Sequence, residues 1–497
     1  MTPNSSGATS PAIVWHRQDL RLADHSALHR VLHLDQPFLP IFVWDEAQIP
    51  IGAAPRWWLA ASLRALQQRY RARGVELLVL RGDSLTVLDR LVRQLGASRL
   101  LYHRCYEPQA CALEAAIESR APSWNVTVEA YDDRFLLLPE QVRRQRPEPY
   151  RIFTSFWQAC WRHRRDIANP LADPHCLPIA ALPSALSLEH MKLDPLVEAS
   201  PLQEAPFQEE PWMPGEDGAH QRLTQFLCDS LAQYPMRRDR PSIDGTSRLS
   251  PHLHFGEITP RQVWHAVLPE EASGPWARAS RGALAFLRQL GWREFALHTL
   301  TICPQMGEHP MRTVYDRIPW LNDAAMLMRW QEGRTGYPLV DAGMRQLRRT
   351  GWLPNRVRMV TASFLVKHLL IDWRQGAQWF LQMLVDADLA NNALGWQWVT
   401  GYGFDAVPAF RIFNPVRQSM LHDPDGTYIR RWVPELASLP APQIHEPWTC
   451  AMDTGKTSPT RRHGAYPSPC VDLAMARERA LYTYAQVVSR SRIRQGP

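Results

Sequence analysis

The chain lacks the features that define stapled, membrane-spanning or secreted proteins. Its eight cysteines are scattered along 497 residues without a C-x-x-C pair, which argues against a zinc ribbon, a redox motif and a disulfide framework. No run of roughly 18 apolar residues suggests a membrane span. The opening MTPNSSGATSPA has neither the basic nor the apolar segment of a secretory signal. We therefore expect a cytoplasmic protein without a bound metal.

The composition is that of a globular protein with room for two or three domains. Hydrophobic residues make up 45% of the chain and charged residues 21%. The net charge of +7 favours a polyanionic partner, although basic enzymes are common. The 20 tryptophans are unusually many, and core packing is their ordinary explanation unless their positions indicate more.

The first part of the chain alternates short apolar runs with amphipathic stretches such as 57–73 and 85–95. This βαβ rhythm predicts a parallel sheet covered by helices, hence a Rossmann-like α/β domain over about residues 1–135. The predicted strands are residues 12–15, 38–44, 76–80, 100–103 and 126–130.

Prolines recur from 167 to about 218, which predicts a long proline-rich linker within an interdomain segment at 136–218. Beyond it, strand signals nearly vanish and apolar residues recur at helical spacing, so 219–485 is predicted to be an all-α domain. The clearest helical stretches are 219–231, 283–300, 356–370 and 377–385, and the last thirty residues favour a terminal helix.

Four stretches of the second part carry residue types suited to chemistry. In the first, Ser250 is a good helix N-cap and Pro251 a good first helical residue, so the 246–250 run should open a helix whose N-terminus could bind phosphate. In the second, Gln289, Trp292 and Arg293 share a helix face. Each is also compatible with a purely structural role.

The third stretch places Asn355 one helical turn before Met359, with arginines interleaved. That mixture suits a damaged base beside phosphates, although a plain basic helix face is equally compatible. The fourth holds the acids and amides of 386–392. Its apolar neighbours and missing ligand spacing argue against a metal loop, and hydrogen bonding to a cofactor or to helix caps fits better.

Taken in order, these stretches and the Trp-x-Arg-Gln-Asp-Leu-Arg-Leu opening at 15–22 resemble the DNA photolyase and cryptochrome superfamily over nearly the whole chain. The class I photolyases of cyclobutane pyrimidine dimers are the most similar members. The resemblance implies that the helical domain binds FAD. The residues that match the FAD site are Tyr234, Thr246, Ser247, Arg248, Leu249, Ser250, Phe286, Arg358, Asp386, Ala387, Asp388 and Asn392.

The resemblance also implies a light-driven repair reaction, in which an electron passes from reduced FAD to a flipped-out dimer in UV-damaged DNA. The residues at the dimer would be Trp292, Gln289, Asn355, Met359 and Trp398. An electron relay would run from Trp396 through Trp373 to Trp320 at the surface. DNA phosphates would be held by Arg238, Arg293, Arg356, Arg411 and Gln418.

Gln289 departs from the class I pattern, which has glutamate there, and is typical of (6-4) photolyases and animal cryptochromes. The (6-4) enzymes carry two histidines where this chain has Asn355 and Met359, so their acid and base are missing. A cryptochrome photoreceptor and a single-strand-specific photolyase remain alternatives. A second antenna chromophore would be methenyltetrahydrofolate, a deazaflavin or absent, and we expect a monomer without a membrane partner.

Overall fold

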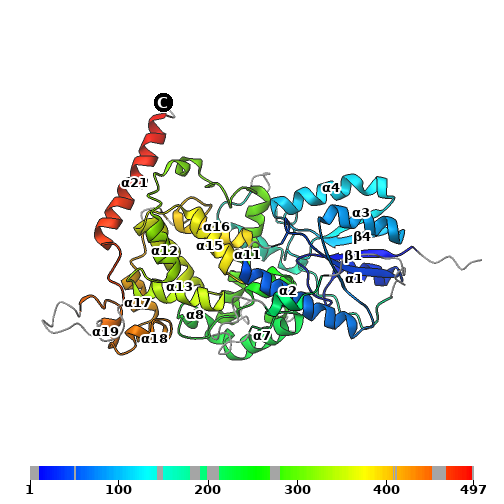
Figure 1. The fold of residues 1–497 in the computed structure, drawn as a ribbon, viewed down its shortest axis with the longest axis horizontal. Coiled ribbons are helices and arrows are strands. Elements are labelled where there is room, and N and C mark those ends of the chain that lie inside the picture. The colour runs from blue at the N-terminus through cyan, green and yellow to red at the C-terminus, as the bar shows by residue number, and fades with distance from the viewer. Residues whose placement is uncertain are drawn as a thin grey trace, which may run out of the picture.

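The computed structural model describes most of the chain and has an α/β part and a larger helical part (Figure 1). Among the helices that the structure describes, none is long and apolar enough to cross a membrane. The described residues are 10–49, 52–142, 149–178, 191–198, 212–268, 280–406, 408, 411–449 and 466–494.

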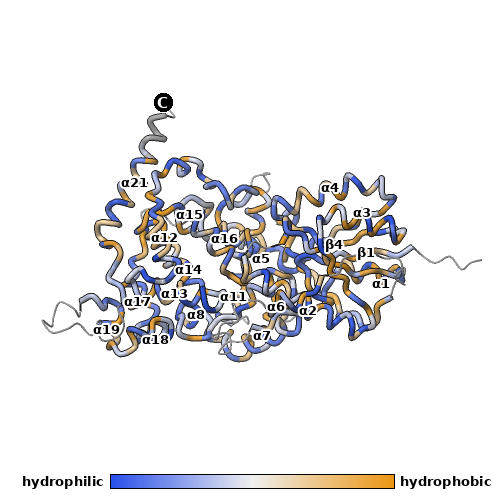
Figure 2. The backbone as a smooth tube through the Cα atoms, in the orientation of Figure 1, coloured by the Kyte–Doolittle hydropathy of each residue, from blue (hydrophilic) through white to orange (hydrophobic). Residues whose placement is uncertain are grey.

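The α/β part is built on one parallel sheet of five strands in the order β3-β2-β1-β4-β5. Every residue of β1 and β2 is buried, because helices cover both faces and the strands are continuous apolar runs. Figure 2 colours much of this sheet as hydrophobic. The predicted parallel sheet is confirmed. The strands are β1 (Ala12–His16), β2 (Phe38–Trp44), β3 (Leu78–Arg81), β4 (Arg99–His103) and β5 (Thr127–Tyr131).

Helices connect these strands in the order that the βαβ rhythm predicts. Asp83 caps the third of them by accepting a hydrogen bond from the Thr86 N–H, and Gly96 ends it in the left-handed conformation. The helices are α1 (Ser26–His33), α2 (Ala53–Arg71), α3 (Ser84–Leu95) and α4 (Pro108–Trp124).

The remainder is helical, as predicted, apart from short 3₁₀ segments and loops. The predicted interdomain segment contains two of the helices, α5 (Phe153–Arg162) and α6 (Asp194–Glu198). The others are α7 (Glu216–Asp229), α8 (Tyr234–Arg237), α9 (Ser250–His254), α10 (Pro260–Val267), α11 (Arg281–Ile302), α12 (Ala324–Glu332), α13 (Pro338–Thr350), α14 (Asn355–Ser363), α15 (Trp373–Met383), α16 (Leu389–Thr400), α17 (Pro415–His422), α18 (Thr427–Trp432), α19 (Ala441–Ile444) and α21 (Leu473–Arg494).

Three sequence predictions need correction at element ends. Ser250 is the first residue of α9 rather than its N-cap, which is Leu249, because the chain reverses at Arg248 with φ of 50°. Helix α7 begins at Glu216, inside the predicted linker, since the Glu216 carboxylate is buried and accepts the backbone N–H groups of Leu22 and Ala23. The predicted helix at 356–370 changes to a π-helix at Phe364–His368.

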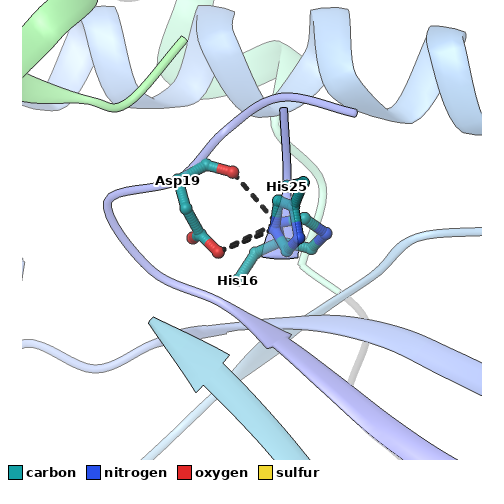
Figure 3. Close-up of side chains that lie close together, drawn as sticks. All are labelled: His16, Asp19 and His25. Atoms are coloured by element: carbon teal, nitrogen blue, oxygen red, sulfur yellow. Dashed lines mark hydrogen bonds and ion pairs between the residues drawn. The ribbon is translucent and has the colours of Figure 1, made fainter. Parts of the chain in front are cut away.

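A buried polar network lies beside the carboxyl ends of β1 and β4. Figure 3 shows His16 and His25 turned towards Asp19. These are metal-ligand residue types, but the Asp19 carboxylate accepts hydrogen bonds from His25 Nε2 at 2.9 Å and His103 Nδ1 at 2.6 Å. His103 Nε2 donates to Asp133 at 2.7 Å. Burial alone would lower the pKa of His103, but the two carboxylates raise it to about 9.

The same network joins the two parts of the molecule. The Asp133 carboxylate lies 3.3 Å from the Arg261 guanidinium of α10, and Arg261 also bonds to Asp24 at 2.8 Å. The Arg21 guanidinium donates to the Gly256 carbonyl at 2.9 Å. Buried charged pairs of this kind are costly to break one partner at a time, so the α/β part is fixed against the helices that surround the site described next.

Candidate functional site

A cavity of about 370 Å³ lies in the helical part, enclosed by α8, α9, α11, α14, α15 and α16. It brings together residues that are more than 150 positions apart in the sequence. The predicted site residues on its wall are Tyr234, Arg238, Thr246, Ser247, Arg248, Leu249, Ser250, Phe286, Gln289, Trp292, Arg293, Asn355, Arg358, Met359, Asp386, Asp388, Asn392 and Trp396.

Seven predicted site residues do not line this cavity. Of the predicted cofactor set only Ala387 is absent from the wall, and of the predicted dimer set only Trp398, which packs against the core of the helical part. Their roles stay predictions, as do those of the rest. The others outside the wall are Trp320, Trp373, Arg356, Arg411 and Gln418.

Arg358 and Asp386, both predicted at the FAD site, form an ion pair on the cavity wall. Arg358 Nη2 donates to Asp386 Oδ2 at 2.8 Å, and Arg358 Nε donates to the Leu353 carbonyl at 2.9 Å. The guanidinium of this α14 residue is therefore held by the loop before α14 and the loop before α16. The other carboxylate oxygen of Asp386 is buried and has no hydrogen-bond partner within the described part of the protein.

Asp388 performs a different task two residues later. Its side chain caps α16 by accepting the backbone N–H of Asn391 at 2.8 Å. His254 Nδ1 lies 3.4 Å from the other oxygen, and the Arg134 guanidinium 3.5 Å from it. Burial would raise the pKa of Asp388, but the hydrogen bond and the charges of His254 and Arg134 hold it well below its usual range. The carboxylate is ionised at neutral pH.

Asn392 and Trp396 are linked one turn apart on α16. The Trp396 indole N–H donates to Asn392 Oδ1 at 3.1 Å, while Asn392 Nδ2 donates to the Ala377 carbonyl at 3.0 Å. Gly376 of α15 is what lets the indole approach, because a Cβ there would lie 2.2 Å from a ring carbon of Trp396. The indole is thus clamped between α15 and α16 with one edge at the cavity.

The other two tryptophans of the predicted relay lie in the same core as Trp396. Trp373 opens α15 and is 1% exposed, while Trp320 is partly exposed and packs on that core. Their segments are joined by a backbone contact, in which the Leu321 N–H donates a hydrogen bond to the Leu370 carbonyl at 2.9 Å. The relay through these three indoles stays a prediction.

Asn355 and Met359 lie at the exposed end of the cavity. Asn355 is exposed, and its Nδ2 lies 3.7 Å from the Met359 sulfur. Two of the arginines predicted to hold phosphate are nearby: Arg238 lines the cavity, and Arg356 Nη2 donates to Asp239 at 2.8 Å. This end of the cavity combines amide, thioether and positive charge.

Arg293 has a different environment from the other predicted phosphate ligands. Its side chain is 11% exposed, and Nη1 donates to the Arg134 carbonyl and to Glu294, both at 2.9 Å. Glu294 in turn accepts the backbone N–H of Leu136 at 2.7 Å, and burial raises its pKa to about 7. The guanidinium therefore ties α11 to the chain that leaves β5.

The cavity wall also contains residues that sequence reasoning did not assign. His254 lies one helical turn beyond the predicted 246–250 run, and Trp352 belongs to the Gly-Trp-Leu-Pro run before Asn355. The Arg248 guanidinium lies 5.0 Å from the centre of the Trp352 ring. The position of Trp352 beside a recognised motif was the available signal.

The wall fits a large ligand that has both flat rings and polar groups. Among the residues that the structure describes, Asp386 Oδ1, His254 Nε2 and Trp352 Nε1 are buried and have no hydrogen-bond partner. Leaving such an atom unpaired costs about 1–3 kcal/mol. Aromatic and aliphatic side chains, among them Phe286 and Leu249, complete the wall. FAD has the rings and the hydrogen-bonding groups that this wall would pair.

Comparisons with known proteins agree with this geometry. Residues 12–175 match the family model described as DNA photolyase, and residues 286–486 match the FAD binding domain of DNA photolyase. The fold and the cavity thus define an FAD-binding protein with a parallel α/β domain and a helical domain. The chain belongs to the DNA photolyase family, within the photolyase and cryptochrome superfamily.

Similar proteins include both photolyases and cryptochromes. A deoxyribodipyrimidine photo-lyase of Agrobacterium fabrum is 40% identical over 96% of this chain and 98% of its own length. The structure of a bacterial class III photolyase from Agrobacterium tumefaciens superposes with a TM-score of 0.89 at 38% identity, covering 98% of this chain and 99% of that one. A Synechocystis cryptochrome structure gives 0.85 at 29% identity, covering 96% and 99%. These similarities support the superfamily, whereas class I stays a prediction.

Proposed function

We propose that this protein is a deoxyribodipyrimidine photolyase that splits cyclobutane pyrimidine dimers in DNA under blue light. The observation that carries the proposal is that one cavity has on its wall eleven of the twelve predicted cofactor residues and four of the five residues predicted at the dimer. A flipped-out dimer in that space would lie beside the bound cofactor. When bound, reduced FAD would supply the electron that light drives onto the dimer.

The residues of the chain would bind and orient the lesion. Extrusion of a dimer is less costly than that of a normal base because a dimer is already poorly stacked. The indole of Trp292 would stack on the extruded dimer, and the amides of Gln289 and Asn355 would donate hydrogen bonds to its carbonyl oxygens. The arginines at the exposed end, Arg238 and Arg356, would hold the flanking phosphates and set the register.

The three tryptophans would serve preparation of the enzyme rather than repair itself. Trp396 lies on the cavity wall, Trp373 is buried in the same core and Trp320 is partly exposed. We propose that electrons pass along them from the surface to the cavity. A second chromophore of the folate or deazaflavin type remains part of the proposal for light collection.

The test is repair of defined lesions by the flavin-loaded protein. Oligonucleotides with one thymine dimer, single- and double-stranded, are irradiated with blue light in the presence of protein, and the remaining dimers are counted by chromatography. We expect light-dependent loss from duplex DNA, none in the dark, and a much reduced loss with Asn355→Ala. A protein that binds FAD but removes no dimer from either DNA would contradict the proposal and favour a photoreceptor.

One observation favours a second candidate, repair of (6-4) products. Gln289, typical of (6-4) photolyases, is on the cavity wall. Asn355 and Met359 stand where those enzymes have their two histidines, so proton transfer at those positions is absent. The same assay with a (6-4) product distinguishes the two, since only the favoured substrate should disappear.

A further inference from the structure

Phe153 covers one face of the indole that is proposed to stack on the lesion. It is the first residue of α5, in the segment between the two domains, and its side chain is fully buried. The ring lies parallel to that of Trp292, with 3.8 Å between ring centres and 6° between planes. Trp292 lines the cavity and Phe153 does not. The indole therefore meets the cavity with the parts that Phe153 leaves uncovered.

Phe153 is itself held from several sides. Its backbone N–H donates to Asp405 Oδ2 at 3.1 Å, which fixes the start of α5 to the loop after α16. Its ring is parallel to Trp157, with 6.3 Å between centres and 9° between planes. Phe295 is edge-on to Phe153 at 5.9 Å and to Trp292 at 5.8 Å. Neither stacked ring can tilt without moving these neighbours.

The backbone next to the indole is equally restricted. A Cβ at Gly291 would lie 2.3 Å from a ring carbon of Trp157, so α11 can approach α5 this closely only because residue 291 is glycine. Arg288, one turn before Trp292, has its guanidinium carbon 4.8 Å from the centre of the Phe153 ring. Helices α5 and α11 are therefore packed around the pair of stacked rings.

We propose that Phe153 is a positioning residue for lesion recognition, which sets the plane of Trp292 so that its free face can stack on an extruded pyrimidine dimer. The inference rests on the proposed function, because it takes Trp292 as the stacking indole. An indole without Phe153 could rotate about its side-chain torsions and would lose stacking area. The indole would then have to become ordered when the DNA binds, and the entropy cost of that ordering lowers the affinity.

The test compares lesion affinity in four enzymes, each loaded with FAD: wild type, Phe153→Leu, Trp292→Leu and the double variant. Dark binding is measured with a duplex carrying one thymine dimer and with the same undamaged duplex. Aromatic pairing of this kind typically corresponds to about threefold to tenfold in affinity, and we expect Phe153→Leu to weaken binding of the dimer duplex by that factor. Binding of the undamaged duplex should not change.

The double variant separates positioning from general loosening of the core. If Phe153 acts through the indole, Phe153→Leu should have no further effect once Trp292 is leucine. The matched control is Phe156→Leu, because Phe156 is equally buried on α5 and packs on Phe295, and it should leave dimer affinity unchanged. Should leucine at 153 reduce flavin content, Phe153→Met takes its place, because the longer, unbranched side chain adapts better to the space of the ring.

Three results would overturn the inference: wild-type dimer affinity in Phe153→Leu, an equal loss for both duplexes, or the same further loss when Trp292 is leucine. A different result identifies failure of the stacking role that the proposed function gives to Trp292, and failure of the proposed function itself is recognised by the absence of light-dependent dimer loss in the wild type. If Trp292→Leu binds the dimer duplex as the wild type does, the lesion does not stack on that indole, and the stacking role proposed for Trp292 fails together with this inference.

Discussion

Asp386 offers a sharp test of the cofactor assignment. One of its oxygens is paired with Arg358 at 2.8 Å, and the other is buried on the cavity wall with no partner in the described part of the chain. Asp386→Asn keeps the shape of the side chain and removes its charge. A hydrogen bond to a charged group contributes about 1.5–3 kcal/mol, so losing one to FAD should raise the Kd for FAD about 10- to 150-fold.

The variant also weakens an internal ion pair, and that effect must be separated from ligand binding. The control is Glu435→Gln, because Glu435 pairs with Arg345 at 2.7 Å, is only partly exposed and lies outside the cavity wall. Both variants should lose stability in urea unfolding of the flavin-free protein. Only Asp386→Asn should lose affinity for FAD.

FAD affinity is measured by titrating flavin-free protein and following the quenching of flavin fluorescence. Wild-type affinity in Asp386→Asn would refute the reasoning, since the unpaired oxygen would then not face the flavin. An equal loss in Glu435→Gln would refute it differently, by showing that FAD binding follows overall stability rather than a contact at residue 386.

Three further predictions follow from the geometry. Trp396→Phe should abolish photoreduction of oxidised flavin, followed by absorbance under blue light, while pre-reduced enzyme still repairs dimers; unchanged photoreduction would remove the relay assignment. Arg356→Ala should weaken damaged and undamaged DNA alike and lower the slope of log K against log salt by about 1, whereas a selective loss for damaged DNA would place Arg356 at the lesion. Burial lowers the pKa of Lys367 to about 7, and its unfolded value is about 10.5. Between these two pKa values the unfolded chain holds the proton and the folded chain does not. The unfolding free energy is therefore at its full value above the unfolded pKa and decreases as the pH falls to 7. Between pH 8 and 9 the unfolding free energy of the wild type should rise relative to that of Lys367→Met by about 1.4 kcal/mol. Urea unfolding of both proteins at the two pH values measures this difference, and an equal change in both proteins would contradict the prediction.

The parallel sheet could be predicted from the sequence because its signal is local. Strands buried on both faces are continuous apolar runs bounded by polar turns, and the predicted limits differ from the observed ones by at most two residues. The helix start at Ser250 was predicted one position wrongly because the cap rule assumes that the side chain caps the helix, whereas the reversal at Arg248 sets where α9 begins.

The π-helix at Phe364–His368 has no local sequence signal. All five of its side chains are buried, and Lys367 reaches across to donate to the Thr400 carbonyl at 2.9 Å while lying 3.7 Å from the centre of the Tyr484 ring. These contacts hold the amine against α16 and α21. The extra residue in the helical turn is thus a consequence of tertiary packing.

At the site, too, the motif predicts which residues take part, whereas tertiary contacts determine what each of them does. Asp386 and Asp388 are the same residue type two positions apart, and the motif alone assigned both to the cofactor. In the folded chain one carboxylate oxygen of Asp388 caps α16, and the other lies beside His254 and Arg134. One oxygen of Asp386, in contrast, has no partner among the described residues and lies at the cavity. His254 and Arg134 come from segments more than a hundred residues away from Asp388. A carboxylate whose oxygens already accept hydrogen bonds has little capacity left for a ligand. The two acids should therefore contribute unequally to FAD binding. This difference arises only when the helical cap and the interdomain contact are both formed.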